Sequence, residues 1–328
     1  MLEDVKKLAG ARKIVNECLD TQPGEKVFVL TDLNKKRIGE IVAAAAYEVT
    51  DDVIMAVITP RELHGEDPPA RIVPAMIESD IIIMPLSFSM THAEATDKAR
   101  KNGARVVSMG DFTESMLEEG GIEADFLDIK NTVEKIASIF NKGKKATVIT
   151  SKGTKLEMDI EGRPGASEPG VSLKPGNICS TPNIEANVGP LEGTTEGIIV
   201  VDGSIPHPSL GVIKQPIKVT VENGEITKIH DTETNPQAKT FEKMLENMDD
   251  PNIYNIAELG IGLNPSSNIC GSMLEDEGVA GTCHIGIGDN RSFEGNVKAK
   301  SHIDLVLRDA TIKIDGKFIQ ENGELKLD

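Results

Sequence analysis

Two histidines and one aspartate stand in positions that suit metal binding. His284 and His302, two of only six histidines in the chain, lie in the strand-like runs GTCHIGIG and SHIDLVL. Asp304 follows His302 by two residues, so in an extended strand both side chains leave the same face. Their Cα atoms would then lie about 6–7 Å apart, which lets an imidazole and a carboxylate hold one ion.

Two glutamates could complete such a site. Glu258 lies in the otherwise apolar run NIAELGIGLNP, where an unpaired buried carboxylate would cost several kcal/mol. Glu185 lies in the Pro/Gly-rich stretch CSTPNIEANVGPLEGTTEG. Taken singly, each residue has an ordinary explanation, such as a hydrogen-bonded polar group in a β domain. Together, two imidazoles and three carboxylates are typical of a site for two divalent ions, because carboxylates bridge cations about 3.5–4 Å apart and neutral imidazole suits zinc, cobalt or iron(II).

The elements that must position these residues fall into two halves. Before residue 145, helical patterns such as KKRIGEIVAAAAYEVT alternate with short apolar runs such as KVFVLTD and DIIIMPLS, as in a parallel sheet covered by helices. After it, period-two runs such as ATVITSKGTKLEMDIEG and PIKVTVENGEITKIH predominate, with one helix at about QAKTFEKMLENM. The sequence therefore predicts an N-terminal parallel-sheet α/β domain over 1–144 and a β-rich metal-binding domain over 145–328 that carries every candidate ligand.

Composition argues against several classes of function. The formal net charge of −18 leaves no visible basic face for nucleic acid. No apolar run is long enough to cross a membrane, and the start, MLEDVKKLAG, is too charged for a signal peptide, so we expect a cytoplasmic protein without a membrane partner. The four cysteines form no CxxC pair, and neither a GxxxxGK[ST] loop nor a GxSxG elbow occurs.

Several of these segments also resemble a known family. PNIEAN with EGTTEG, AELGIGLNP, GTCHIGIGDN and SHIDLVL are similar, in order and spacing, to the metal-site segments of the aminopeptidase T/aminopeptidase S family. THAEATDKARKNGARVVSMGDFTESML resembles a segment of that family's first domain. The resemblance implies a homodimeric metalloprotease, a hydrolase that removes N-terminal residues from peptides or acts on a similar small molecule. It also implies two divalent ions, zinc, cobalt or manganese, held by the following residues: Glu185, Glu258, His284, His302 and Asp304.

Arg291 marks a departure from that family. The aminopeptidases carry a tyrosine seven residues after the first of the two histidines, and this chain has Arg291 there. A guanidinium can stabilise an oxyanion but cannot exchange a proton near neutral pH. The predicted catalytic residues are therefore Arg291, for the oxyanion, and Glu185, which would accept the proton of a metal-activated water, with Glu258 as the alternative base.

Other readings stay open. The chain has a more distant likeness to iron(II) dihydroxypyridine dioxygenases, whose single metal is held by two histidines and one carboxylate, a set that suits oxygen chemistry. The presence of both Glu185 and Glu258 favours the hydrolase over this alternative. A third possibility is a metal-retaining binding protein without peptidase activity. His207, between prolines in GSIPHPSLG, is either a surface residue or one that faces the substrate.

Overall fold

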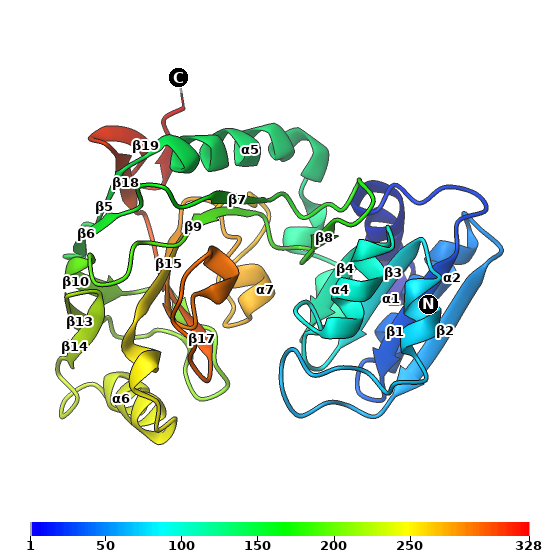
Figure 1. Cartoon of the computed structure of the whole chain (residues 1–328), viewed down its shortest axis with the longest axis horizontal. Helices are drawn as coiled ribbons and strands as arrows, with labels where there is room; N and C mark the ends of the chain where they lie inside the picture. Colours follow the sequence, from blue (N-terminus) through cyan, green and yellow to red (C-terminus); the bar gives the residue numbers. More distant parts are fainter. Residues whose placement is uncertain (1, 328) are drawn as a thin grey trace. The chain divides into compact units, whose positions relative to one another are not determined.

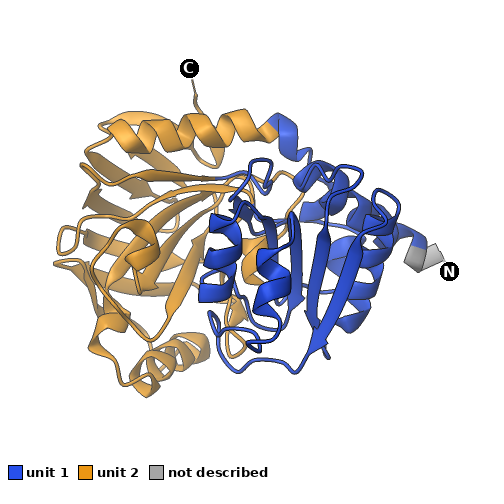
Figure 2. Ribbon diagram, turned by 45° about the vertical axis from the view of Figure 1, so that its right-hand side comes forward, with its two compact units in different colours: residues 1–128, 168–183 blue, residues 129–167, 184–328 orange. Residues whose placement is uncertain are grey.

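The computed structural model describes residues 2–327, which form two compact units (Figure 2). Unit 1 consists of Met1–Asp128 and Glu168–Asn183, and unit 2 of Ile129–Ser167 and Ile184–Asp328. This division does not coincide with the expected boundary between residues 144 and 145. Most of the helix before that boundary belongs to unit 2, and the segment 168–183 returns to unit 1 because its short strand pairs with the sheet there.

Unit 1 is a parallel α/β sheet, as the alternation of helical and apolar patterns predicted. Its five strands have the order β2-β1-β3-β4-β8, and each adjacent pair runs parallel. β1 and β3 are buried along their whole length, which explains their nearly continuous Val, Ile and Leu content. The strands are β1 (Val27–Asp32), β2 (Val53–Ile58), β3 (Ile81–Leu86), β4 (Arg105–Gly110) and β8 (Ile178–Cys179).

Helices alternate with these strands along the chain (Figure 1). The core of unit 1 forms where apolar side chains of the strands meet those of the helices, for example Ile82 of β3 and Ala99 of α4. The helices are α1 (Leu2–Lys13), continued by a π-helical turn (Ile14–Cys18), α2 (Lys36–Tyr47), α3 (Val73–Ile77) and α4 (Glu94–Lys101). Two 3₁₀ turns, Ser115–Leu117 and Gly121–Glu123, precede α5 (Phe126–Lys142).

Unit 2 is built mainly of antiparallel strands. An eight-stranded sheet has the order β14-β13-β10-β6-β5-β18-β19-β20, and β5 and β6 form the hairpin that the period-two pattern predicted. Side chains of β13 alternate between buried and exposed, as expected for a sheet with one covered face. These strands are β5 (Lys145–Ile149), β6 (Lys155–Asp159), β10 (Glu196–Val201), β13 (Ile217–Glu222), β14 (Glu225–Ile229), β18 (Thr311–Ile314), β19 (Lys317–Glu321) and β20 (Glu324–Leu325).

A second, five-stranded sheet of unit 2 has the order β17-β16-β15-β9-β7. β15 and β16 are buried on both faces, so any polar side chain that they carry is held in the interior. The strands are β7 (Gly165–Glu168), β9 (Glu185–Val188), β15 (Ile256–Gly262), β16 (Cys283–Gly288) and β17 (His302–Leu307). The remaining elements are β11 (Ser204–Ile205), β12 (Gly211–Val212), α6 (Pro236–Asn247), α7 (Met273–Asp276), and the 3₁₀ turns Pro251–Tyr254 and Arg291–Phe293.

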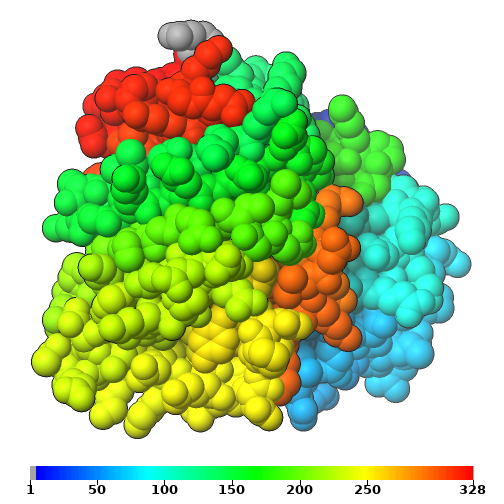
Figure 3. All heavy atoms as spheres, turned by 60° about the vertical axis from the view of Figure 1, so that its left-hand side comes forward, coloured from blue at the N-terminus to red at the C-terminus, as the bar shows by residue number. Residues whose placement is uncertain are grey.

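The C-terminal strands lie beside α5 on one face of unit 2 (Figure 3). Ile139 of α5 and Ile314 of β18 line a shared surface groove there. The fold class is thus confirmed: a parallel α/β unit and a β-rich unit. Within the described residues, no helix combines the length and apolar character needed to cross a bilayer.

Candidate metal centre

Four adjacent strands of the five-stranded sheet carry the five residues that the sequence proposed as ligands. Glu185 begins β9, Glu258 lies in β15, His284 in β16, and His302 and Asp304 in β17. The antiparallel register places Gly286 opposite both Glu258 and Asp304, so these carboxylates flank one position of β16. The structure therefore brings all five side chains together in unit 2.

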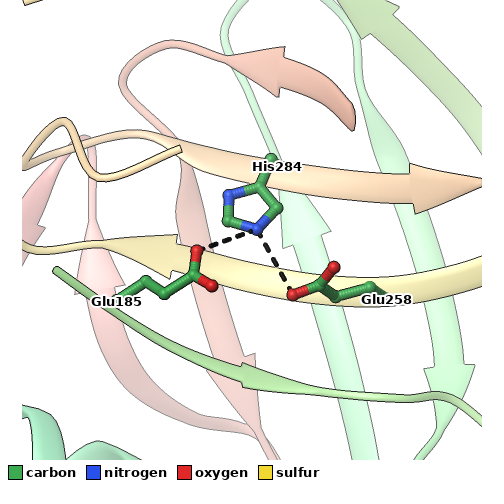
Figure 4. A group of neighbouring side chains, drawn as sticks. All are labelled: Glu185, Glu258 and His284. Carbon is green, nitrogen blue, oxygen red and sulfur yellow. Dashed lines mark hydrogen bonds and ion pairs between the residues drawn. The ribbon is translucent and has the colours of Figure 1, made fainter. Parts of the chain in front are cut away.

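The first group of ligand atoms surrounds His284. Its Nε2 lies 3.2 Å from Glu185 Oε2 and 3.4 Å from Glu258 Oε1 (Figure 4). All three residues are buried. Their ligand atoms lie within 4.8 Å of one another, which is close enough to bind a common ion.

The second group shares Glu258 with the first. Its Oε2 lies 3.0 Å from His302 Nε2, which is also 3.2 Å from Asp304 Oδ1. These ligand atoms likewise lie within 4.8 Å of one another. Glu258 thus directs one oxygen toward each imidazole, and both histidines present Nε2 to the same carboxylate.

Glycines make room for the imidazoles. A Cβ atom on Gly260 would lie 2.0 Å from His284 Nε2, and one on Gly286 would lie 2.5 Å from His302 Cε1. Any larger residue would occupy the space of a ring, because real Cβ contacts do not reach such distances. Gly260 and Gly286 therefore have a steric role, because each histidine ring lies over a glycine of the neighbouring strand.

The electrostatics of the cluster suit a cation. Burial alone lowers the pKa of His284, but the negative charges of Glu185 and Glu258 prevail and raise it to about 10. His302 behaves in the same way, with Asp304 as the main cause of its raised pKa. Without an ion, protons on the imidazoles therefore supply positive charge that the buried carboxylates require. A divalent cation bound by neutral imidazoles would supply it instead, so these residues fit a metal ion.

The sequence analysis missed one carboxylate of this cluster. Glu277 follows α7 and lies within hydrogen-bonding reach of Asp304. Desolvation and the negative charges of Asp304 and Glu185 raise its pKa well above the usual range, so it holds a proton at neutral pH. Its position in the acidic run LEDEG resembles a solvated turn, and the only available signal was that this run ends a few residues before GTCH.

Arg291 and His207 lie outside the two ligand groups. Arg291 is in a 3₁₀ turn, with its side chain 55% exposed and its Nη2 2.8 Å from Asp289 Oδ2. His207 is half-buried in the loop between β11 and β12, where its Nδ1 lies 2.7 Å from Ser209 Oγ. The guanidinium thus neutralises a neighbouring carboxylate at the surface.

Comparison with known proteins identifies the family of the chain. The family model described as 2,5-dihydroxypyridine 5,6-dioxygenase matches residues 11–327, so the chain belongs to that family. A 2,5-dihydroxypyridine 5,6-dioxygenase from Pseudomonas putida is 23% identical over 261 residues, which cover 76% of this chain and 72% of the relative.

Two solved structures share the fold. The 2,5-dihydroxypyridine dioxygenase from Pseudomonas putida KT2440 has a TM-score of 0.80 at 18% identity, covering 99% of this chain and 98% of that one. Wild-type AmpT from Thermus thermophilus has a TM-score of 0.67 at 13% identity, covering 98% of this chain and 99% of that one. At these identities the two structures are evidence for the fold alone.

The family match corrects the expected reaction. The prediction of a hydrolase, an aminopeptidase of the metalloprotease type, is wrong, and the dioxygenase alternative has the stronger support. The error came from taking Glu185 and Glu258 as markers of hydrolysis. One fold supports several chemistries, and buried carboxylates beside histidines specify a cation without specifying its reaction. The water-activating role of Glu185 and the oxyanion role of Arg291 were predicted for that hydrolysis, and the family match does not bear on either residue.

Proposed function

We propose that the protein is an iron(II)-dependent dioxygenase that cleaves a dihydroxylated aromatic ring of the pyridine type. The observation that carries the proposal is the pair of imidazoles whose Nε2 atoms face one carboxylate, Glu258, in a chain of a dioxygenase family. Two histidines and one carboxylate are a typical ligand set for non-haem iron(II) in oxygenases. His284 and His302 would hold one iron, with Glu258 or Asp304 as the carboxylate.

Bound ferrous iron supplies the electron chemistry that allows dioxygen to react with an aromatic ring. The protein's own residues would bind that ion and manage protons. Glu185 is a buried carboxylate whose Oε2 lies next to His284 Nε2, so it is the candidate base for the proton of a ring hydroxyl group. Glu277 would hold its proton beside Asp304 and limit the repulsion among the carboxylates.

Oxygen uptake tests the proposal directly. Purified protein would be loaded with ferrous iron without air and then mixed with 2,5-dihydroxypyridine in oxygenated buffer. We expect one molecule of dioxygen consumed per ring, together with loss of the ring's ultraviolet absorbance. Parallel reactions with catechol, hydroquinone and 2,5-dihydroxybenzoate would show whether the ring nitrogen is required.

A variant and a metal count complete the test. His302→Ala should consume no oxygen, and one iron per chain is expected in the wild-type protein. Retention of iron without oxygen uptake on any of these rings would refute the proposed reaction and favour a metal-retaining binding protein. Retention of two ions per chain would contradict the single-iron centre, and both ligand groups would then be in use.

A further inference from the structure

His302 is oriented by the loop that precedes its strand. This loop, residues 289–301, connects β16 to β17. The Nδ1–H of His302 donates to the backbone carbonyl of Asp289 at 2.8 Å, which leaves Nε2 to face Glu258 and Asp304. The ring of Phe293 packs against the imidazole, with centroids 5.2 Å apart and the planes tilted by 37°. The loop therefore sets both the tautomer and the ring plane of His302.

Asn290, near the start of this loop, makes hydrogen bonds to several of its other residues. Its side chain is 1% exposed, and its Oδ1 accepts the backbone N–H of Val297 at 2.8 Å. Its backbone carbonyl accepts the N–H groups of Phe293 and Gly295, each at 3.0 Å. Gly295 lies so close that a Cβ there would be 2.0 Å from Asn290 Cγ. The loop thus winds around the asparagine, and a displacement of Asn290 would displace Asp289 and Phe293.

An ion pair between Arg163 and Glu192 holds Asn290 from outside the loop. Glu192, in the segment between β9 and β10, accepts Asn290 Nδ2 at 2.9 Å and Asn296 N at 2.8 Å with its Oε1. Its Oε2 pairs with the guanidinium of Arg163, which also donates to the backbone carbonyl of Glu294. Arg163 is only 7% exposed and the Glu192 side chain 29%, so the guanidinium is held in the interior while its partner carboxylate is partly exposed. A charge-assisted pair of this kind is geometrically specific.

We propose that Arg163, Glu192 and Asn290 are positioning residues for His302. They fix the loop, the loop fixes the Nδ1–H bond and the ring plane, and these fix the direction of Nε2 at the metal centre. His284 has no such support, because its buried Nδ1 finds no hydrogen-bond partner among the described residues. The inference rests on the proposed function only in that His302 binds an ion.

The test exchanges the two ends of one hydrogen bond. Asn290→Asp places a second carboxylate against Glu192 Oε1, where like charges repel. We expect the affinity for Zn²⁺, used as a diamagnetic probe, to fall about 10- to 100-fold, the usual effect of losing the support of a ligand histidine. Adding Glu192→Gln returns a donor to the pair, so the double variant should recover part of the affinity. Glu196→Gln is the matched control, because Glu196 is exposed, lies four residues after Glu192 at the start of β10 and also accepts a backbone N–H, that of Asn223 at 2.7 Å.

Imidazole ¹⁵N spectra of the zinc-loaded protein distinguish a specific effect on His302 from a general loss of order at the metal centre. The Nδ1 and Nε2 signals of His302 should move in Asn290→Asp and return toward their original values in the double variant, whereas those of His284 should stay. Unchanged affinity and unchanged His302 signals would overturn the proposal, as would equal movement of both histidines. If Asn290→Asp does not fold, Glu192→Gln alone, which keeps the side-chain shape, must move the His302 signals. These readouts need no ring cleavage, so a failure of the proposed dioxygenase reaction would be seen separately.

Discussion

Glu258 is central to the site because each of its oxygens faces a different imidazole. Oε1 lies 3.4 Å from His284 Nε2, and Oε2 lies 3.0 Å from His302 Nε2. Burial alone would raise the pKa of this carboxyl group, but the two histidines lower it, so it is ionised. An ionised carboxylate between two imidazoles attracts a cation and aligns both Nε2 atoms with it. The same arrangement explains why the residues found one by one in the sequence act as a unit.

The ligands differ in how replaceable they are. His302→Ala should abolish retention of iron, since no other imidazole faces Glu258 Oε2 in the described structure. Asp304→Ala should retain part of the bound iron, because Glu277 lies beside Asp304 and can offer a carboxylate in its place. The double variant Asp304→Ala/Glu277→Gln should retain no iron. Iron would be measured by mass spectrometry after anaerobic loading and desalting. His230→Ala, which removes a histidine bound to Thr220 Oγ1 at 2.8 Å, is the control, and loss of iron there would point to general damage.

Ion binding should depend steeply on pH. Neighbouring carboxylates outweigh burial and raise the pKa of ion-free His284 to about 10, so its imidazole is protonated at neutral pH and must lose that proton to bind a metal. As pH rises toward 10 the competing proton is lost, and affinity for Zn²⁺ should increase by up to about tenfold per pH unit for each proton displaced. Titration calorimetry in buffers of different ionisation enthalpy measures the released protons. Zero release at pH 7 would contradict the proposed protonation state.

At the scale of the elements, glycines in β15 and β16 decide whether histidines fit. Gly260 pairs with His284 across the two strands, and its missing side chain leaves the space that the ring occupies. Strands normally disfavour glycine, so these positions sacrifice some intrinsic strand stability for the site.

Gly260→Ala tests this steric argument. The new Cβ would overlap His284 Nε2, so the ring must move, and we expect loss of Zn²⁺ affinity together with a destabilisation of about 1–3 kcal/mol, as for other overpacked interiors. Denaturant unfolding measures the free energy. In a His284→Ala background the ring is absent, and Gly260→Ala should then lower the free energy of unfolding by clearly less. An equal cost in both backgrounds would show that the backbone, and not the imidazole, resists the methyl group.

At the scale of the whole molecule, each unit has its own buried core, and the ligand groups lie entirely within unit 2. An ion that binds only the folded state stabilises that state by mass action. Calorimetric unfolding should therefore show two transitions, and Zn²⁺ should raise the midpoint temperature of only one of them, that of unit 2. The corresponding gain in unfolding free energy is about 2.7 kcal/mol when the free ion is at 100 times its Kd. Asp304→Ala/Glu277→Gln should remove the shift. A shift of both transitions by equal amounts would contradict independent unfolding of the units.

The oligomeric state is also a property of the whole molecule. The homodimer that the aminopeptidase resemblance implied stays a prediction, and light scattering on the purified protein would check it.

The amino-acid sequence was enough to predict the fold class and to select the five residues whose side chains gather in unit 2. Helical and period-two patterns are local, because they report which side of each element is buried. Glu258 and His284 could be recognised because a polar residue in an apolar run needs a partner, and His302 with Asp304 because alternate residues of a strand share a face.

Tertiary structure alone decided the rest, since it depends on contacts between segments distant in the sequence. Pairing of β8 with β4 returns residues 168–183 to unit 1, which no local pattern could indicate. Glu277, in an acidic run, reaches Asp304 only through the path of the chain after α7. The link from Arg163 through Glu192 to Asn290 joins three separate loops. The reaction could not be read from the ligands, because histidine and carboxylate groups serve hydrolysis and oxygenation alike, and their surroundings decide between them.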